Sequence, residues 1–283
     1  MSISELPCAY CESTAATYCG DNATQMPCVQ WGAVTVAEPA TMLTDVAVGA
    51  ACAIAATLLG IQQRRRPQHC TLLWAIGFAL LGLSFTLAGC EHGFGRYTLC
   101  EGRDKCRFVS ELWLGSMILA VVAPSCMVCA YLARHGRFDR WHWAQLALPA
   151  VAVPSYVVVL LAGAATGDRG LRSFNTMVAF LAPVMLELCG LCFVAYRRAL
   201  RLPPLEGSLA AERWIAAALA LVVLAQVWQV PKYNPSRWFN ANDVSHTIFL
   251  CAVPPLYCGA ARHRAWDDSD GGSRTVAVCF GRK

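Results

Sequence analysis

The chain alternates long apolar runs with short polar segments. A transmembrane helix needs about 20 mostly apolar residues. No ten-residue segments of alternating hydrophobicity, the pattern of a membrane barrel, are present in the sequence. The pattern predicts an all-α membrane protein, a single bundle of seven transmembrane helices. The seven apolar runs lie near residues 39–62, 70–91, 109–133, 143–164, 174–197, 209–230 and 241–261.

Composition supports a membrane-embedded chain with polar ends. Of its 283 residues 57% are hydrophobic and 14% charged, whereas soluble domains have about 25% charged residues. No basic patch interleaved with aromatic residues indicates a nucleic-acid partner. We predict an N-terminal tail at 1–37, the bundle at 38–262 and a disordered C-terminal tail at 263–283.

The arginines predict the orientation in the membrane. Residues 1–38 contain no Lys or Arg, whereas residues 64–66 are three arginines and the segments after the third, fifth and seventh runs are also arginine-rich. Short loops rich in Lys and Arg stay on the cytoplasmic side. The N-terminus is therefore predicted outside and the C-terminus in the cytoplasm, in a plasma membrane or an endomembrane.

Sixteen cysteines are present, and some of them flank the predicted outer side of the bundle. Disulfides persist in oxidising compartments, so these cysteines are predicted to pair, with the connectivity open and one thiol left over. The competing interpretation is a metal site on the CAYC motif, but a single C-x-x-C is weak evidence for zinc. The cysteines concerned are Cys8, Cys11, Cys19, Cys28, Cys90, Cys100 and Cys106.

The last apolar run opens with polar residues in the segment WFNANDVSHTIFL, residues 238–250. Residues four apart share a helix face and residues three apart nearly do. Asn242 and His246 therefore point the same way, with Asp243 close beside them. An ionisable group within a membrane span is a functional-site hypothesis by default, so partners are expected on other helices.

Three other runs carry ionisable residues at a similar depth. Asp45 follows the start of the first run, His92 ends the second in GCEHGFG, and Glu111 begins the third. Asp45, Glu111 and Asp243 are the candidate catalytic acids. A structural alternative remains for each, because first-turn acids stabilise a helix N-terminus and Asp45 can hydrogen bond to a neighbouring helix.

Two imidazoles and several carboxylates support a limited chemistry. They suit Zn²⁺ with an open position for water, which lowers the pKa of that water to about 7 and polarises a carbonyl. A second carboxylate can then serve as general base. The same groups equally suit a proton relay or a structural hydrogen-bonded cluster, and spacing alone does not choose among the three.

The order of these motifs resembles the superfamily of seven-helix membrane hydrolases that contains alkaline ceramidases and adiponectin receptors. The closer likeness is to a ceramidase-like branch with Thr44 and Asp45, a His-Gly after the second helix and Asn-Asp-x-x-His in the seventh. The resemblance implies zinc held by His92 and His246, with Asn242 in the place of a third ligand. It also implies hydrolysis of lipid amide or ester bonds by a ceramidase-like enzyme.

Two other classes of function remain open. Pro254 and Tyr257 near the end of the last run loosely match G-protein-coupled receptors, and a transporter or other noncatalytic membrane protein is the third class. A retinal-binding rhodopsin is excluded, because it needs a bundle lysine and the lysines lie at 105, 232 and 283. The expected partners are the lipid bilayer and a lipid substrate, while the oligomeric state is open.

Overall fold

The structure is a computed structural model. It describes residues 28–31, 34–95, 111–133, 140–166, 168, 170–201, 206–229, 235–236 and 238–263. Within these ranges, seven helices are long and apolar enough to cross a membrane. The predicted seven-helix architecture is confirmed to that extent. The helices are α2 (Pro39–Arg65), α3 (His69–Cys90), α5 (Glu111–Ala133), α6 (Arg140–Thr166), α7 (Phe174–Arg201), α8 (Glu206–Gln229) and α9 (Ala241–Arg262).

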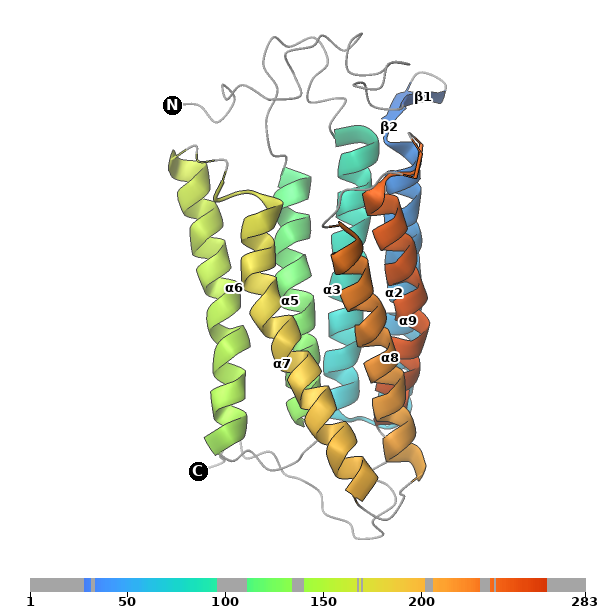
Figure 1. Ribbon diagram of the computed structural model, residues 1–283, viewed down its shortest axis with the longest axis vertical. Helices are drawn as coiled ribbons and strands as arrows, with labels where there is room; N and C mark the ends of the chain where they lie inside the picture. The colour runs from blue at the N-terminus through green and yellow to red at the C-terminus, as the bar shows by residue number, and fades with distance from the viewer. Residues whose placement is uncertain are drawn as a thin grey trace.

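The seven helices stand side by side along one long axis (Figure 1). We call the end of the bundle where α2 begins, drawn uppermost in Figure 1, the upper end. The opposite end, where α9 ends, is the lower end. Helices α2, α3, α8 and α9 form one side of the bundle, and α5 joins them to α6 and α7 (Figure 1). The start of α2, the end of α3 and the start of α9 therefore meet at the upper end.

A short antiparallel ribbon precedes the bundle, which the apolar pattern did not predict. Strand β1 (Cys28–Trp31) pairs with β2 (Val34–Ala37), with Val29 opposite Val36. Four-residue strands are too short to show a reliable alternation beside a helix of more than 20 residues. Residues 1–27 and 264–283 lie outside the described residues, so most of both predicted tails does too.

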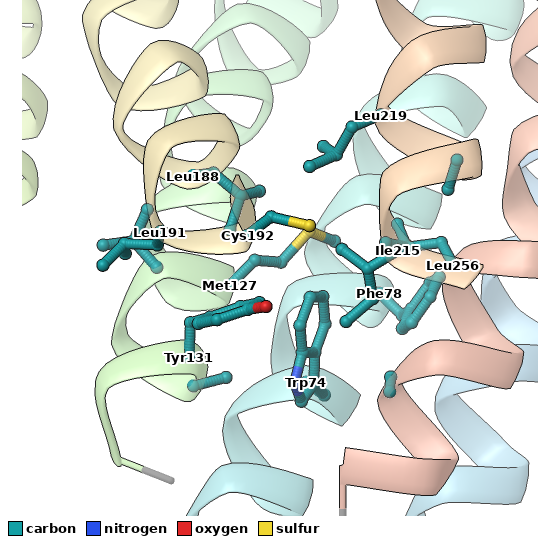
Figure 2. Close-up of a cluster of buried hydrophobic side chains, with 14 of the residues drawn as sticks. Trp74, Phe78, Met127, Tyr131, Leu188, Leu191, Cys192, Ile215, Leu219 and Leu256 are labelled. Atoms are coloured by element: carbon teal, nitrogen blue, oxygen red, sulfur yellow. The ribbon is translucent and has the colours of Figure 1, made fainter. Parts of the chain in front are cut away.

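Apolar side chains from α3, α5, α7, α8 and α9 pack together inside the bundle (Figure 2). Trp74, Phe78, Leu188 and Ile215 are almost completely buried and belong to one continuous cluster. By contrast, apolar side chains on the outer faces of the helices remain exposed, such as Leu186 at 72%. An apolar exterior around a packed core is the arrangement expected of helices that face lipid tails.

Small residues let the helix backbones approach closely. A Cβ atom on Gly82 of α3 would lie 3.0 Å from the carbonyl oxygen of Gly49 on α2. Membrane helices commonly associate through such small residues, because no hydrophobic driving force between helices is available in lipid. Close α2–α3 packing fixes the relative positions of the polar residues at the upper ends of these helices.

Candidate functional site

The site begins at Glu38, which connects β2 to α2. Its φ of 44° and ψ of 53° place it in the left-handed region, and it is the one non-glycine residue with positive φ in the described part of the chain. A residue before proline is restricted further, and Pro39 follows. Such strain persists only where surrounding contacts hold it, and it clusters at functional sites. Glu38 is therefore a candidate site residue.

The Glu38 carboxylate binds an imidazole rather than its own helix. No side-chain cap joins Glu38 to the first turn of α2. Instead its Oε2 atom lies 2.9 Å from Nδ1 of His92, and both side chains are 5% exposed. Because an ionised carboxylate is only an acceptor, the His92 Nδ1–H donates this hydrogen bond, and Nε2 is left facing away from Glu38.

The backbone after α3 delivers His92 to Glu38. Residues Glu91–Gly95 form a π-helix, η2, a rare element that is frequent at functional sites. A Cβ atom on Gly93 would lie only 2.2 Å from Sδ of Met42 on α2. Because Gly93 has no Cβ atom, η2 packs closely against the Met42 side chain of α2, and the GCEHGFG motif brings His92 beside Glu38.

A second carboxylate–imidazole pair joins α2 to α9. The Nδ1 atom of His246 lies 2.9 Å from Oδ1 of Asp45, with 14% and 0% of the two side chains exposed. The geometry of these two atoms does not meet the criteria of a hydrogen bond, so the contact is described as an ion pair. Gly89 of α3 allows it, since a Cβ atom there would lie 3.0 Å from the Cβ of Asp45.

The start of α9 is held by a capping box. The Asn240 side-chain oxygen accepts hydrogen bonds from the backbone N–H groups of Asn242 and Asp243, and Oδ2 of Asp243 accepts from the Asn240 N–H at 2.6 Å. This arrangement satisfies otherwise unpaired N–H groups at the helix start. Oδ1 of Asp243 is buried without a hydrogen-bond partner among the described residues. Asp243 thus both caps α9 and offers one free oxygen.

Thr41 and Asp243 connect the two pairs. Asn240 donates from Nδ2 to the Thr41 hydroxyl oxygen at 3.2 Å. The Asp243 carboxyl interacts with Thr41 and lies within electrostatic range of both His246 and Glu38. The groups therefore form one unit, the upper polar cluster, which consists of Glu38, Thr41, Asp45, His92, Asn240, Asp243 and His246.

Aromatic rings border the two imidazoles. Trp113 of α5 meets His92 edge-on with ring centroids 6.0 Å apart, and Phe85 of α3 meets His246 edge-on at 5.5 Å. These rings restrict the orientations of the imidazoles. Each histidine is thus held by a carboxylate near Nδ1 and by an aromatic ring, an arrangement suited to moving a proton at Nε2.

The donor set does not complete a zinc site. Catalytic zinc takes three protein ligands and keeps one open position. No group of three or more His, Cys, Asp or Glu side chains in the described ranges is arranged to hold a metal ion. A carboxylate beside Nδ1 is the usual outer partner of a zinc-binding histidine, and here Glu38 and Asp45 each occupy that place beside an imidazole. The described residues therefore do not fit a catalytic zinc ion by themselves.

The structure brings some of the predicted site residues together. Asp45 meets His246, and Asp243 lies beside them. The backbone N–H of Asn242 donates a hydrogen bond to the side-chain oxygen of Asn240. Glu111 begins α5, but its side chain lies outside the described part of the structure. The catalytic and ligand roles of these residues stay predictions.

Sequence reasoning missed two members of the cluster, Glu38 and Thr41, and did not include Asn240 among the candidate site residues. Glu38 and Thr41 look like ordinary residues at a helix start, and Asn240 looks like an ordinary N-cap. One signal was available, because the Glu-Pro dipeptide before the first apolar run marks a helix start with restricted backbone. The pairing of Glu38 with a residue 54 positions away was not readable from spacing.

Most of the cysteines predicted to form disulfides lie outside the described residues. Cys90 lies at the end of α3 as a free thiol, which is compatible with one thiol being left over. The disulfides stay a prediction.

Comparison with known proteins gives a family but no function. No curated protein and no solved structure matches the chain. The model of a family of unknown function, DUF6962, matches residues 40–265, which include all seven helices except Pro39, the first residue of α2. The chain therefore belongs to this family of unknown function, DUF6962.

Proposed function

We propose that the upper polar cluster is the catalytic centre of a membrane hydrolase that cleaves amide or ester bonds of lipids. One observation carries the proposal. Two buried carboxylate–imidazole pairs, Glu38–His92 and Asp45–His246, occupy one end of the bundle, and Asp243 lies within electrostatic range of one member of each pair. Ionisable groups at this depth are costly and are usually retained for function. The resemblance to ceramidase-like hydrolases points to the same class of reaction.

The two imidazoles suit opposite roles in hydrolysis. Because His92 donates from Nδ1 to Glu38, its Nε2 lone pair can take a proton from a water molecule. The water oxygen then bonds to the lipid carbonyl carbon. Protonated His246, held beside Asp45, gives its Nε2 proton to the departing nitrogen or oxygen as the bond from the carbonyl carbon breaks. The proton on His92 returns to His246 through solvent, which restores both groups.

The location of the cluster favours a lipid as substrate. Asp45 and His246 lie within the membrane-spanning helices α2 and α9, near their upper ends. The amide and ester groups of lipids lie at the boundary between headgroups and hydrocarbon, a short distance inside the membrane surface. A site at this depth can reach such a bond without withdrawing the lipid chains from the membrane.

We also infer that the upper end faces away from the cytoplasm. Helix α2 ends at the lower end with Arg64 and Arg65 in its last turn, and α9 ends there with Arg262. Arginines near membrane-helix ends favour the cytoplasmic side. The substrate would then come from the noncytoplasmic leaflet.

The proposal predicts histidine-dependent turnover of a lipid. The purified full chain, in discs made from a total lipid extract, is expected to release fatty acid detectable by mass spectrometry. His92→Gln and His246→Gln are each expected to lower the rate by about 10²- to 10⁴-fold, the usual contribution of general acid–base catalysis. His69→Gln is the matched control, because His69 is exposed at the start of α3, away from the cluster.

Two results would contradict this proposal. One is that no lipid in the extract is consumed by folded wild-type protein. The other is turnover that is unchanged in both cluster variants. In either case the carboxylate–imidazole pairs would be better explained as proton-binding groups of a transporter or receptor.

A measurement of metal content tests the zinc hypothesis separately. Because no group of three or more His, Cys, Asp or Glu side chains in the described ranges is arranged to hold a metal ion, we expect the zinc content not to depend on His246. Elemental mass spectrometry of wild-type, His246→Ala and His69→Ala proteins checks this. About one zinc ion per chain, lost only in His246→Ala, would contradict the expectation and restore a zinc-dependent mechanism.

A further inference from the structure

Exposed arginines lie at the lower end of the bundle, away from the upper polar cluster. They belong to helices that pack against one another, because α9 contacts both α2 and α8 (Figure 1). Arg64 and Arg65 end α2, Arg213 lies near the start of α8 and Arg262 ends α9, and all four side chains are exposed. The proposed hydrolysis uses none of these residues.

The last turn of α9 holds Arg262 against α8. The Cζ atom of Arg262 lies over the Trp214 ring, 5.8 Å from its centroid, a distance at which a cation is attracted to an aromatic face. Nη1 of Arg262 also donates to the backbone oxygen of Cys258 at 3.2 Å. These two contacts fix the guanidinium beside a tryptophan that directly follows Arg213. The remaining N–H donors of Arg262 meet no other partner among the described residues.

Arg213 lies at the same level but within a membrane span. It belongs to the apolar span Leu209–Gln229 of α8, in the turn that packs against Gly259 of α9. Within the described part of the chain, no acidic side chain pairs with Arg213. The preceding residue, Glu212, is buried and accepts a hydrogen bond from the Tyr131 hydroxyl instead. A charged side chain on a membrane helix is costly unless its head reaches the polar interface, where lipid phosphates can supply the negative charge.

The outer face of α8 indicates that the anion belongs to a lipid. Leu224 and Val227 follow Arg213 by about three and four helical turns on the same face, and they are 48% and 58% exposed. A phosphate bound at Arg213 therefore leaves an apolar surface along which its acyl chains can lie. A soluble anion or an acidic peptide would use only the charged end of this surface.

The surrounding charge favours a headgroup with a net negative charge. Arg64 and Arg65 lie one helix away, because Nε2 of Gln62 in the last turn of α2 donates to the backbone oxygen of Ala261 at 3.2 Å. Arginines near a membrane surface attract anionic lipids, which are concentrated in the cytoplasmic leaflet. The lower end is the one that we place on the cytoplasmic side.

We propose that Arg213, Trp214 and Arg262 form a binding site for a phospholipid whose headgroup carries a net negative charge. The two guanidinium groups bind the phosphate through charge-assisted hydrogen bonds, the Trp214 ring holds Arg262 in place, and the acyl chains lie along α8. The site is at the opposite end of the bundle from the upper polar cluster and does not depend on lipid hydrolysis.

Native mass spectrometry of the purified full chain in detergent micelles tests this site. The probes are phosphatidylserine and phosphatidylcholine with identical ether-linked chains, which the proposed hydrolysis cannot cleave. Both contain the phosphate, and they differ in net charge. The wild type is expected to bind phosphatidylserine at least about tenfold more tightly, and Arg213→Gln and Arg262→Gln should each weaken that binding about fivefold, the usual contribution of one arginine near a membrane surface. Phosphatidylcholine binding should not change.

Two further variants separate a specific site from diffuse positive charge. Arg197→Gln is the matched control, because Arg197 is an exposed arginine on α7 and its replacement removes the same charge. It should leave phosphatidylserine binding unchanged. Arg262→Lys keeps the charge but loses the planar group over Trp214, and the two residues are not interchangeable at such a position. This variant should therefore also bind phosphatidylserine more weakly, and it decides the question if Arg262→Gln fails to fold.

Three results would overturn the proposal. The first is equal affinity of the wild type for the two lipids. The second is an equal loss of phosphatidylserine binding in Arg197→Gln and Arg213→Gln, or no loss in Arg262→Lys, since either would reduce the arginines to diffuse charge. The third is displacement of phosphatidylserine by soluble glycerol 3-phosphate, which would show that the ligand is a free phosphate. None of these measurements requires lipid turnover, so their failure is distinct from failure of the proposed hydrolysis.

Discussion

Replacing Asp45 with alanine is expected to lower the free energy of unfolding by about 3–5 kcal/mol, the cost of breaking a buried ion pair by removing one partner. Asp45 is completely buried and lies 2.9 Å from His246, so its loss leaves that imidazole without its carboxylate. The same variant is expected to reduce lipid turnover by about 100-fold or more, because the proposed general acid loses its orienting group. Denaturant unfolding in mixed micelles measures the first effect.

Two variants separate the charge of Asp45 from its shape. Asp45→Asn keeps the size of the side chain and is expected to lose less stability than Asp45→Ala. Thr44→Ala is the positional control, because among the described residues the Thr44 hydroxyl donates to the Thr41 backbone oxygen of its own helix. Equal stability of Asp45→Ala and Thr44→Ala would show that the Asp45–His246 contact contributes nothing to the fold.

Replacing Gly259 with leucine is expected to separate α8 from α9 and to destabilise the protein by about 1–3 kcal/mol, the usual cost of overpacking. A Cβ atom on Gly259 would lie 2.4 Å from Cγ1 of Ile215 and 3.0 Å from the backbone oxygen of Ala211. The side chain of Ile215 can move, but the Ala211 backbone can move only with its helix. The midpoint of thermal unfolding in detergent measures the effect.

Gly60→Leu is the matched control for this substitution. A Cβ atom on Gly60 of α2 meets no atom within 4 Å, so leucine should be accommodated there. Adding Ile215→Ala to Gly259→Leu is expected to recover part of the lost stability, because it removes the closer of the two contacts. Equal unfolding midpoints for the Gly259 and Gly60 variants would contradict the account of α8–α9 packing.

The helices were predictable because the property that defines them is local. A run of about 20 apolar residues can satisfy its backbone in lipid only as a helix or within a closed barrel, and the sequence shows no barrel pattern. Alternating direction then places Asp45 and His246 at the same depth. Their contact in the structure follows from that depth together with the adjacency of α2 and α9.

Other long-range polar contacts in the bundle were not predictable because they depend on helix order and rotation. Trp74 and His263 are 189 residues apart, and Tyr131 and Glu212 are 81 residues apart. In the sequence these residues look like the ends of apolar runs, where aromatic and charged side chains are common. Glu38 was missed for a different reason, since its left-handed backbone and its bond to His92 arise only when η2 packs against α2.

Ionisable groups lie near both ends of α9. His246 in the first half of this helix faces Asp45, and His263 after its last turn faces Glu212. Pro254 and Pro255 lie between them within the helix, where proline removes a backbone donor. The helix is thus tied to different neighbours at its two ends, and each tie involves an imidazole and a carboxyl group.

Lipid hydrolysis in water enriched in the heavy isotope of oxygen tests the central claim most directly. If the upper polar cluster activates water, the fatty acid released by the wild-type protein carries one heavy oxygen atom per cleaved bond. His92→Gln and His246→Gln should then release this labelled acid at least about 100-fold more slowly, while His69→Gln matches the wild type. Labelled acid released equally fast by both cluster variants, or acid without label, would contradict the account.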